Sequence, residues 1–225
     1  MNITNDLVAE ERLEYKIKES GCLSSLTSVE LLAMLFGKSS TLTLQKARDI
    51  LTLTNGSIIG LSKLTTKQIR EVTNFTEQKA NSILAALELG RRSQIEETKN
   101  CKKLDRAECI YNYIKPYIGR LTHEEVWVIL MNNTFKPIKI KKISSGGLTE
   151  TAFDVRIILK EALLNDSTVI AVAHNHPSGN KRPSAEDDRI TSRLKQACNT
   201  MRIYLVDHII ATDSGYYSYS EEGKI

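Results

Sequence analysis

The sequence has 225 residues, of which 41% are hydrophobic and 26% charged, a balance that excludes a disordered chain and predicts one large or two modest globular domains. The net charge of +4 comes from interspersed acidic and basic residues, so it permits nucleic-acid contact without arguing for it. Residues 1–6 lack the features of a signal peptide and no apolar run reaches the roughly 18 residues of a transmembrane helix, so we expect a cytoplasmic protein with no membrane partner.

Helical patterns fill the first part of the chain, in five short segments that begin near residues 11, 27, 43, 65 and 77. Thr27 and Thr65 are each followed three residues later by Glu or Gln, which is typical of a capped helix start. The fifth segment ends near residue 92, and the stretch after Ser93 is polar and aperiodic. We therefore predict an all-α bundle over residues 1–95 and a second domain over residues 101–225.

The second domain alternates strand and helix patterns. Helices are expected over 108–118 and 154–164, and strands over 121–131, 137–143, 167–173, 203–211 and 215–219. The sequence thus predicts an α+β protein in which the helical bundle precedes an α/β sandwich with a mostly antiparallel sheet.

The densest basic cluster consists of Lys136, Lys139, Lys141 and Lys142. Alternation places Lys139 and Lys141 on one strand face, where they either follow a phosphate backbone or an acidic partner, or protect a solvated sheet edge. Glu161, in the 154–164 helix, is expected to be an exposed helical charge.

The most informative stretch follows the 167–173 strand. His174 and His176 are two residues apart, so both imidazoles face the same way at the strand end, and the helix opened by Ser184 brings Asp187 back to them. Two imidazoles and one carboxylate suit Zn²⁺ and leave a fourth tetrahedral position for water, which marks a catalytic site. Because bound Zn²⁺ lowers the pKa of its water toward ~7, the stretch predicts a hydrolase.

The same residues also have other interpretations. Ser184 and Asp187 also form an ordinary helix N-cap pair, a role compatible with metal binding. Asp188 lies about 100° further round the helix, so it and Asp187 cannot both face one metal. The tripeptide His-Asn-His is not the dispersed HNH nuclease motif. The absence of a Cys-x-x-Cys pair argues against a zinc deaminase.

The strings HNHPSG and PSAEDDRIT, with the later LVDHII, resemble the RadC family, and the resemblance covers the chain from about Arg12 onward. It implies a cytidine deaminase-like fold of the JAB/MPN metalloprotease type. It also implies the roles of the site residues: zinc ligands His174, His176 and Asp187, with Ser184 stabilising the tetrahedral intermediate.

The resemblance further aligns Glu124 with the family's general acid/base, and Glu125 is the alternative because a one-residue slip reverses the strand face. Asp207 and His208 resemble a family signature, and we expect them to orient a ligand or to be structural. The implied activity is hydrolysis of a peptide or isopeptide bond in a protein substrate.

The alternative is a DNA-repair-associated protein whose metal site is not peptidolytic, since the resemblance also implies a helix-hairpin-helix module at residues 72–80. In this chain Asn74 and Thr76 replace the expected glycines, and Glu77 places negative charge where a phosphate would bind. Arg91 and Arg92 remain as phosphate contacts or as favourable charges near a helix C-terminus.

Overall fold

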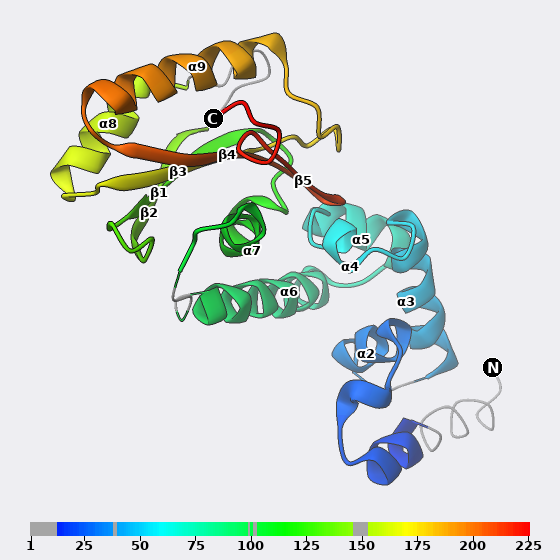
Figure 1. The fold of residues 1–225 in the computed structure, drawn as a ribbon. Coiled ribbons are helices and arrows are strands. Elements are labelled where there is room, and N and C mark those ends of the chain that lie inside the picture. The colour runs from blue at the N-terminus through cyan, green and yellow to red at the C-terminus, as the bar shows by residue number, and fades with distance from the viewer. Residues whose placement is uncertain (1–12, 38–39, 99, 101–102, 146–152) are drawn as a thin grey trace. The chain divides into compact units, whose positions relative to one another are not determined.

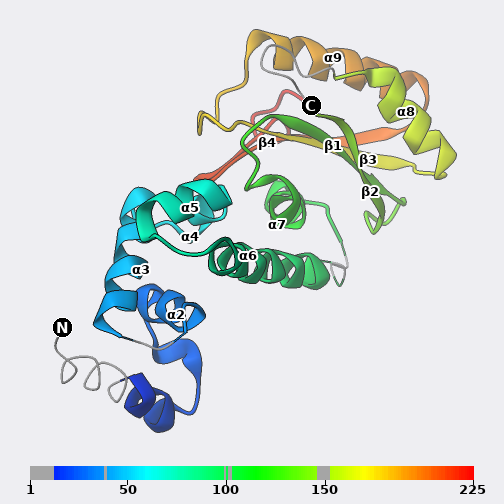
Figure 2. The same cartoon turned by 180° about the vertical axis from the view of Figure 1, so that it is seen from behind.

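The structure is a computed structural model that describes residues 13–37, 40–98, 100, 103–145 and 153–225. The chain divides into two compact units, Met1–Arg91 and Arg92–Ile225, which are described separately (Figures 1 and 2). Within the described ranges, no helix has the length and apolar character needed to span a bilayer. Glu11 and Arg12, where the sequence predicts the first helix to begin, lie outside these ranges.

The first unit is helical. Its elements are a helix over residues 13–20, a 3-10 turn η1 (Leu23–Ser25), α2 (Ser28–Leu35), α3 (Thr41–Leu53), α4 (Ile58–Leu61), α5 (Thr66–Thr73) and the larger part of α6 (Glu77–Thr98), which continues past the last residue of the unit. Thr27 and Thr65 form reciprocal capping boxes, as the sequence predicts. The four-residue α4 was not predicted, because it is shorter than the window in which helical periodicity is recognised.

Helix α6 corrects the predicted boundary segment. The sequence predicts that the helix ends near Arg92, but α6 continues to Thr98. Residues 93–98 contain no glycine or proline, so nothing in this stretch forces the helix to stop. Polarity alone was a poor sign of a helix end here.

The second unit contains a five-stranded sheet. Its elements are α7 (Ala107–Ile118), β1 (Glu125–Met131), β2 (Pro137–Ser145), α8 (Val155–Leu164), β3 (Val169–Asn175), α9 (Ala185–Thr200), β4 (Tyr204–Thr212) and β5 (Gly215–Ser218). The strand order is β2-β1-β3-β4-β5. Strands β3 and β4 are parallel and the other three pairs are antiparallel, which confirms the predicted α+β class.

Helices cover both faces of the sheet. Helix α7 packs on one face, and α8 and α9 pack on the other (Figures 1 and 2). Strand alternation assigns side chains to these faces: Ala171 and Ala173 of β3 lie in the core under α7, whereas Ile170 and Val172 lie in the core under α8 and α9. The same alternation turns His174 toward the α9 side.

The prediction for Glu161 was wrong. This α8 residue is only 7% exposed, because α8 lays it against strand β2. Its carboxylate lies 2.5 Å from the Nζ of Lys141 and 3.6 Å from the Nζ of Lys139. The two lysines do share a strand face, but they use it to pair with a carboxylate of the same chain.

Candidate metal centre

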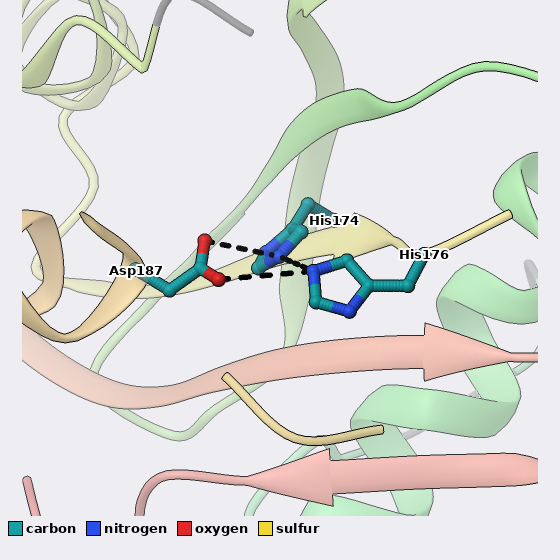
Figure 3. A group of neighbouring side chains, drawn as sticks. All are labelled: His174, His176 and Asp187. Atoms are coloured by element: carbon teal, nitrogen blue, oxygen red, sulfur yellow. Dashed lines mark hydrogen bonds and ion pairs between the residues drawn. The ribbon is translucent and has the colours of Figure 1, made fainter. Parts of the chain in front are cut away.

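Three predicted ligands come together at the C-terminal end of β3 and the first turn of α9. His174 Nε2 lies 3.0 Å from His176 Nε2 and 3.3 Å from Asp187 Oδ1, and His176 Nε2 lies 3.7 Å from Asp187 Oδ2. Figure 3 shows the three side chains pointing toward one another. Among the described residues this is the group of histidine, cysteine and acidic side chains whose ligand atoms are close enough to share one ion.

The separations fit a tetrahedral zinc ion. Ligand atoms about 2.0–2.1 Å from a tetrahedral centre lie about 3.3 Å from each other, and the three observed distances fall on both sides of that value. The donor set of two imidazoles and one carboxylate is also one that zinc accepts.

The tautomer of His176 is fixed by a backbone carbonyl. Its Nδ1 lies 2.7 Å from the carbonyl oxygen of Asn180, which can only accept a hydrogen bond. The proton is therefore on Nδ1, and Nε2 presents its lone pair to His174 and Asp187. This is the form of imidazole that binds a metal.

A longer chain of hydrogen bonds fixes His174. The Thr191 hydroxyl donates to the Asp187 backbone carbonyl at 2.6 Å, so it accepts from His208 Nδ1, also at 2.6 Å. His208 Nε2 then accepts from His174 Nδ1 at 2.9 Å. His174 Nε2 is left without a proton, facing the other two ligands.

Burial keeps the imidazoles of His174 and His208 neutral. Burial lowers the pKa of His174 to about 4, against the opposing charge of Asp187, and it lowers the pKa of His208 well below its usual value. With a neutral ring whose proton is on Nδ1, His174 offers the Nε2 lone pair that a divalent cation would use. His208 thus contacts a predicted ligand directly, which agrees with the expectation that it orients a ligand.

Asp187 is held by its own helix cap. The Ser184 backbone N–H and hydroxyl donate to Asp187 Oδ2 at 2.7 and 2.6 Å, and the Asp187 N–H donates to Ser184 Oγ at 3.1 Å. The cap and the metal-ligand geometry therefore coexist, with Oδ1 turned to His174. Asp188 points elsewhere and pairs with Lys224 at 3.0 Å.

The strand register separates Glu124 from Glu125. Val126 of β1 lies opposite His174 of β3, so the next position on that face, Glu124, falls opposite His176. Glu124 lines the same pocket as the three ligands. The structure thus brings Glu124 to the metal side of the sheet.

Glu125 lies on the α7 side and is buried. Its carboxylate accepts hydrogen bonds from Trp127 Nε1 at 2.9 Å and Lys142 Nζ at 3.1 Å. Burial raises the pKa of Glu125, but Lys142, His123 and Trp127 together outweigh it and hold the pKa below its usual value. This residue is a buried ion-pair partner on the sheet face opposite to His174 and His176.

Asn175 is a site residue that sequence reasoning missed. It lies between the two histidines, so its side chain takes the opposite face, where its Oδ1 accepts from the Glu125 N–H at 2.9 Å and its Nδ2 donates to the His123 carbonyl at 2.8 Å. These two bonds hold the backbone on either side of Glu124, and the bond to His123 continues the β1–β3 pairing beyond the first residue of β1. The two-residue period of β3 predicts that Asn175 faces away from the histidines, but it does not predict which groups Asn175 binds.

Asp207 has a structural role. Its carboxylate accepts from the Ser218 hydroxyl at 2.6 Å, the Ser220 N–H at 3.0 Å and the His208 N–H at 2.7 Å. Burial raises its pKa even though these bonds oppose the shift. Asp207 therefore links β4 to the end of β5 and the residues after it, next to His208.

The ligands open into a pocket of about 880 Å³. Its lining includes Glu124, Ser184 and the three metal ligands, an apolar group formed by Val126, Phe153 and Ile190, and the arginines Arg182, Arg189 and Arg193. This volume lies within the range of about 300–1,000 Å³ that is typical of ligand pockets.

Known proteins place the chain in a family. The family described as RadC-like JAB domain matches residues 104–224. The chain is 37% identical over 214 residues to a UPF0758 protein of Flavobacterium johnsoniae, an alignment that spans 95% of this chain and 91% of that protein. It is 36% identical to a UPF0758 protein of Porphyromonas gingivalis, over 89% of this chain and 90% of the relative. The protein is thus a member of the RadC family, and its second unit is a RadC-like JAB domain.

Proposed function

We propose that the protein is a zinc-dependent hydrolase that cleaves an amide bond, in a peptide or an isopeptide linkage of a protein substrate. The observation that carries the proposal is the convergence of His174 Nε2, His176 Nε2 and the Asp187 carboxylate, close enough to share one ion. These residues would hold the zinc. When bound, the ion would supply Lewis acidity and lower the pKa of water to about 7.

Glu124 is the proposed general base and acid. In this proposal Glu124, which lines the pocket at the start of β1, takes a proton from the attacking water as the oxygen bonds to the carbonyl carbon. The same group then delivers that proton to the amine nitrogen as the C–N bond breaks. Asn175 keeps Glu124 in register through its bonds to residues 123 and 125.

Ser184 is the proposed donor to the carbonyl oxygen. It lines the pocket beside Asp187, and its hydroxyl at present donates to Asp187 Oδ2. A hydroxyl that turns from Oδ2 toward the substrate would stabilise the negative charge that develops on that oxygen. The Ser184 backbone N–H, which also donates to Oδ2, would keep Asp187 oriented during the turn.

The decisive experiment compares Glu124→Gln with Glu125→Gln. In the zinc-loaded protein, Glu124→Gln should retain one zinc per chain and lower hydrolysis of a mixed peptide pool by roughly 10²- to 10⁴-fold. Glu125→Gln is the matched control on the other sheet face, and it should keep its rate per folded molecule. Failure of the wild-type chain to take up zinc, or equal rates in both variants, would refute the proposal.

Nucleic-acid binding has less support. In the α5–α6 hairpin, Asn74 adopts the left-handed conformation that a glycine would otherwise supply, but Glu77 lies 3.8 Å from Arg70 at the start of α6. Lys139 and Lys141 pair with Glu161. A salt-dependent shift of labelled DNA that is lost in an Arg91→Gln, Arg92→Gln variant would revive this alternative.

A further inference from the structure

The acids that line the metal pocket cannot balance both its arginines and a bound divalent cation. The lining contains the acids Glu124, Glu186 and Asp187 and the arginines Arg182, Arg189 and Arg193. A divalent cation held by the three ligands would be balanced by Glu124 and Asp187. Arg189 is balanced by Glu186, which it contacts through two bonds of 2.8 and 2.6 Å. Arg182 and Arg193 are left as surplus positive charges.

Neither surplus arginine is engaged elsewhere in the part of the chain that the structure describes. No ion pair or side-chain hydrogen bond involves the guanidinium of Arg182 or Arg193, whereas the neighbouring acids each have an arginine of their own. Arg156 and Arg189 are the main causes of the lowered pKa of Asp154 and Glu186, and the charge of Arg193 adds to both shifts from further away. Arg193 is therefore near these acids but is not their direct partner.

We propose that Arg182 and Arg193 form a subsite for a carboxylate of the substrate, so that the enzyme acts on acidic peptide segments. Arginine suits this task because its planar guanidinium pairs with a carboxylate through two hydrogen bonds. The inference rests on the proposed hydrolase function, because it uses that function's pocket as the peptide site.

The geometry of α9 indicates where this carboxylate lies. Arg193 follows Asp187 by six residues, which places it about 9 Å further along the helix axis. An extended peptide spans about 3.3–3.6 Å per residue, so the carboxylate belongs within two or three residues of the scissile amide. Phe153 and Ile190 line the same pocket and offer an apolar surface for an intervening side chain.

Two sources of the carboxylate share this chemistry, an acidic side chain and a free C-terminus. The probes are four fluorescein-labelled peptide pools, with apolar residues randomised around one fixed Glu or Gln and with the C-terminus free or amidated. Binding is measured by anisotropy to full-length, zinc-loaded Glu124→Gln protein, so that no peptide is cleaved. The test variant adds Arg182→Gln and Arg193→Gln, and the control adds Lys160→Gln and Arg202→Gln, which remove the same charge outside the pocket.

A carboxylate-bearing pool should bind about fivefold more tightly than its neutral counterpart, and the preference should vanish in the test variant but persist in the control. The Glu-to-Gln comparison identifies a side-chain carboxylate, and the free-to-amidated comparison identifies a C-terminal one.

Equal binding of all pools, or a preference that both variants lose alike, overturns the inference. Tighter, arginine-dependent binding of a labelled single-stranded oligonucleotide would also overturn it. If wild-type protein cleaves no pool while the arginine-dependent preference holds, the hydrolase proposal fails and the subsite stands.

Discussion

At the scale of single residues, the side chains on the two faces at the C-terminal end of β3 have different roles. His174 and His176 present lone pairs on one side, while Asn175 binds two backbone groups of the β1 entry on the other. Asn175 is only 4% exposed, so water does not readily replace its bonds. The position of Glu124 therefore depends on a side chain that does not itself reach the metal.

We expect Asn175→Ala to lower the free energy of unfolding by about 2 kcal/mol, because the buried Glu125 N–H and the His123 carbonyl lose their partner. Urea unfolding followed by tryptophan fluorescence measures this loss. Asn133, an exposed residue of the β1–β2 turn, provides the control, and Asn133→Ala should change the value by less than about 0.5 kcal/mol. Similar values for the two variants would show that Asn175 does not hold the β1 entry.

The backbone conformation of Asn74 explains the residue type at this position. With φ of 53°, it ends α5 in the left-handed conformation, which costs most residues about 1–2 kcal/mol and glycine almost nothing. Asn74→Ala should therefore lower the unfolding midpoint of the helical unit, measured by circular dichroism, whereas Asn74→Gly should leave it equal or higher. A larger loss in the glycine variant would contradict this explanation.

At the scale of elements, the β2–α8 contact depends on a charged side chain taken largely out of water. Lys141 is the main cause that lowers the pKa of Glu161, and burial opposes the shift. A carboxyl whose folded-state pKa is lowered stabilises the fold fully above its ordinary pKa, and this contribution is lost as the pH falls through the lowered value. The edge strand β2 is thus joined to α8 more firmly at neutral than at acid pH.

Glu161→Gln should be clearly less stable than wild type at pH 7, and the gap should shrink as the pH falls below about 4.5. Urea unfolding of both proteins across this range tests the sign. Glu222→Gln, at an exposed position, is the control and should follow wild type throughout. A gap that stays constant with pH would mean that the carboxylate charge at position 161 is not what stabilises the contact.

At the scale of the whole molecule, the candidate metal site lies within one of the two compact units. All three proposed ligands lie in Arg92–Ile225, and so does Trp127, the chain's single tryptophan. Tryptophan fluorescence therefore reports on the metal-binding unit, and a ligand that binds only the folded form stabilises the unit that holds it.

Zinc at a hundredfold excess over its Kd should raise the unfolding free energy reported by Trp127 by about 2.7 kcal/mol. Asp187→Asn should abolish this rise, because it removes a charged ligand. Asp188→Asn is the matched control one residue away, and it should keep the rise, since Asp188 pairs with Lys224. A zinc-induced rise that depends equally on both aspartates would place the ion elsewhere.

The sequence by itself determined what depends on short separations along the chain. The capping boxes of Thr27 and Thr65 lie within four residues, and the period of two places His174 and His176 on one face. The spacing from these histidines to the capped start of α9 was enough to predict the ligand Asp187. Local backbone geometry decides each of these, so no distant contact was needed.

Only the tertiary structure decided what depends on pairing between distant segments. The β1–β3 register placed Glu124 rather than Glu125 on the metal side, and the β3–β4 alignment brought His208 to His174. Packing of α8 on the sheet buried Glu161, where the helical pattern alone predicted exposure. These outcomes depend on which strand or helix lies alongside, and a one-residue change in that alignment would exchange the faces without altering any local pattern.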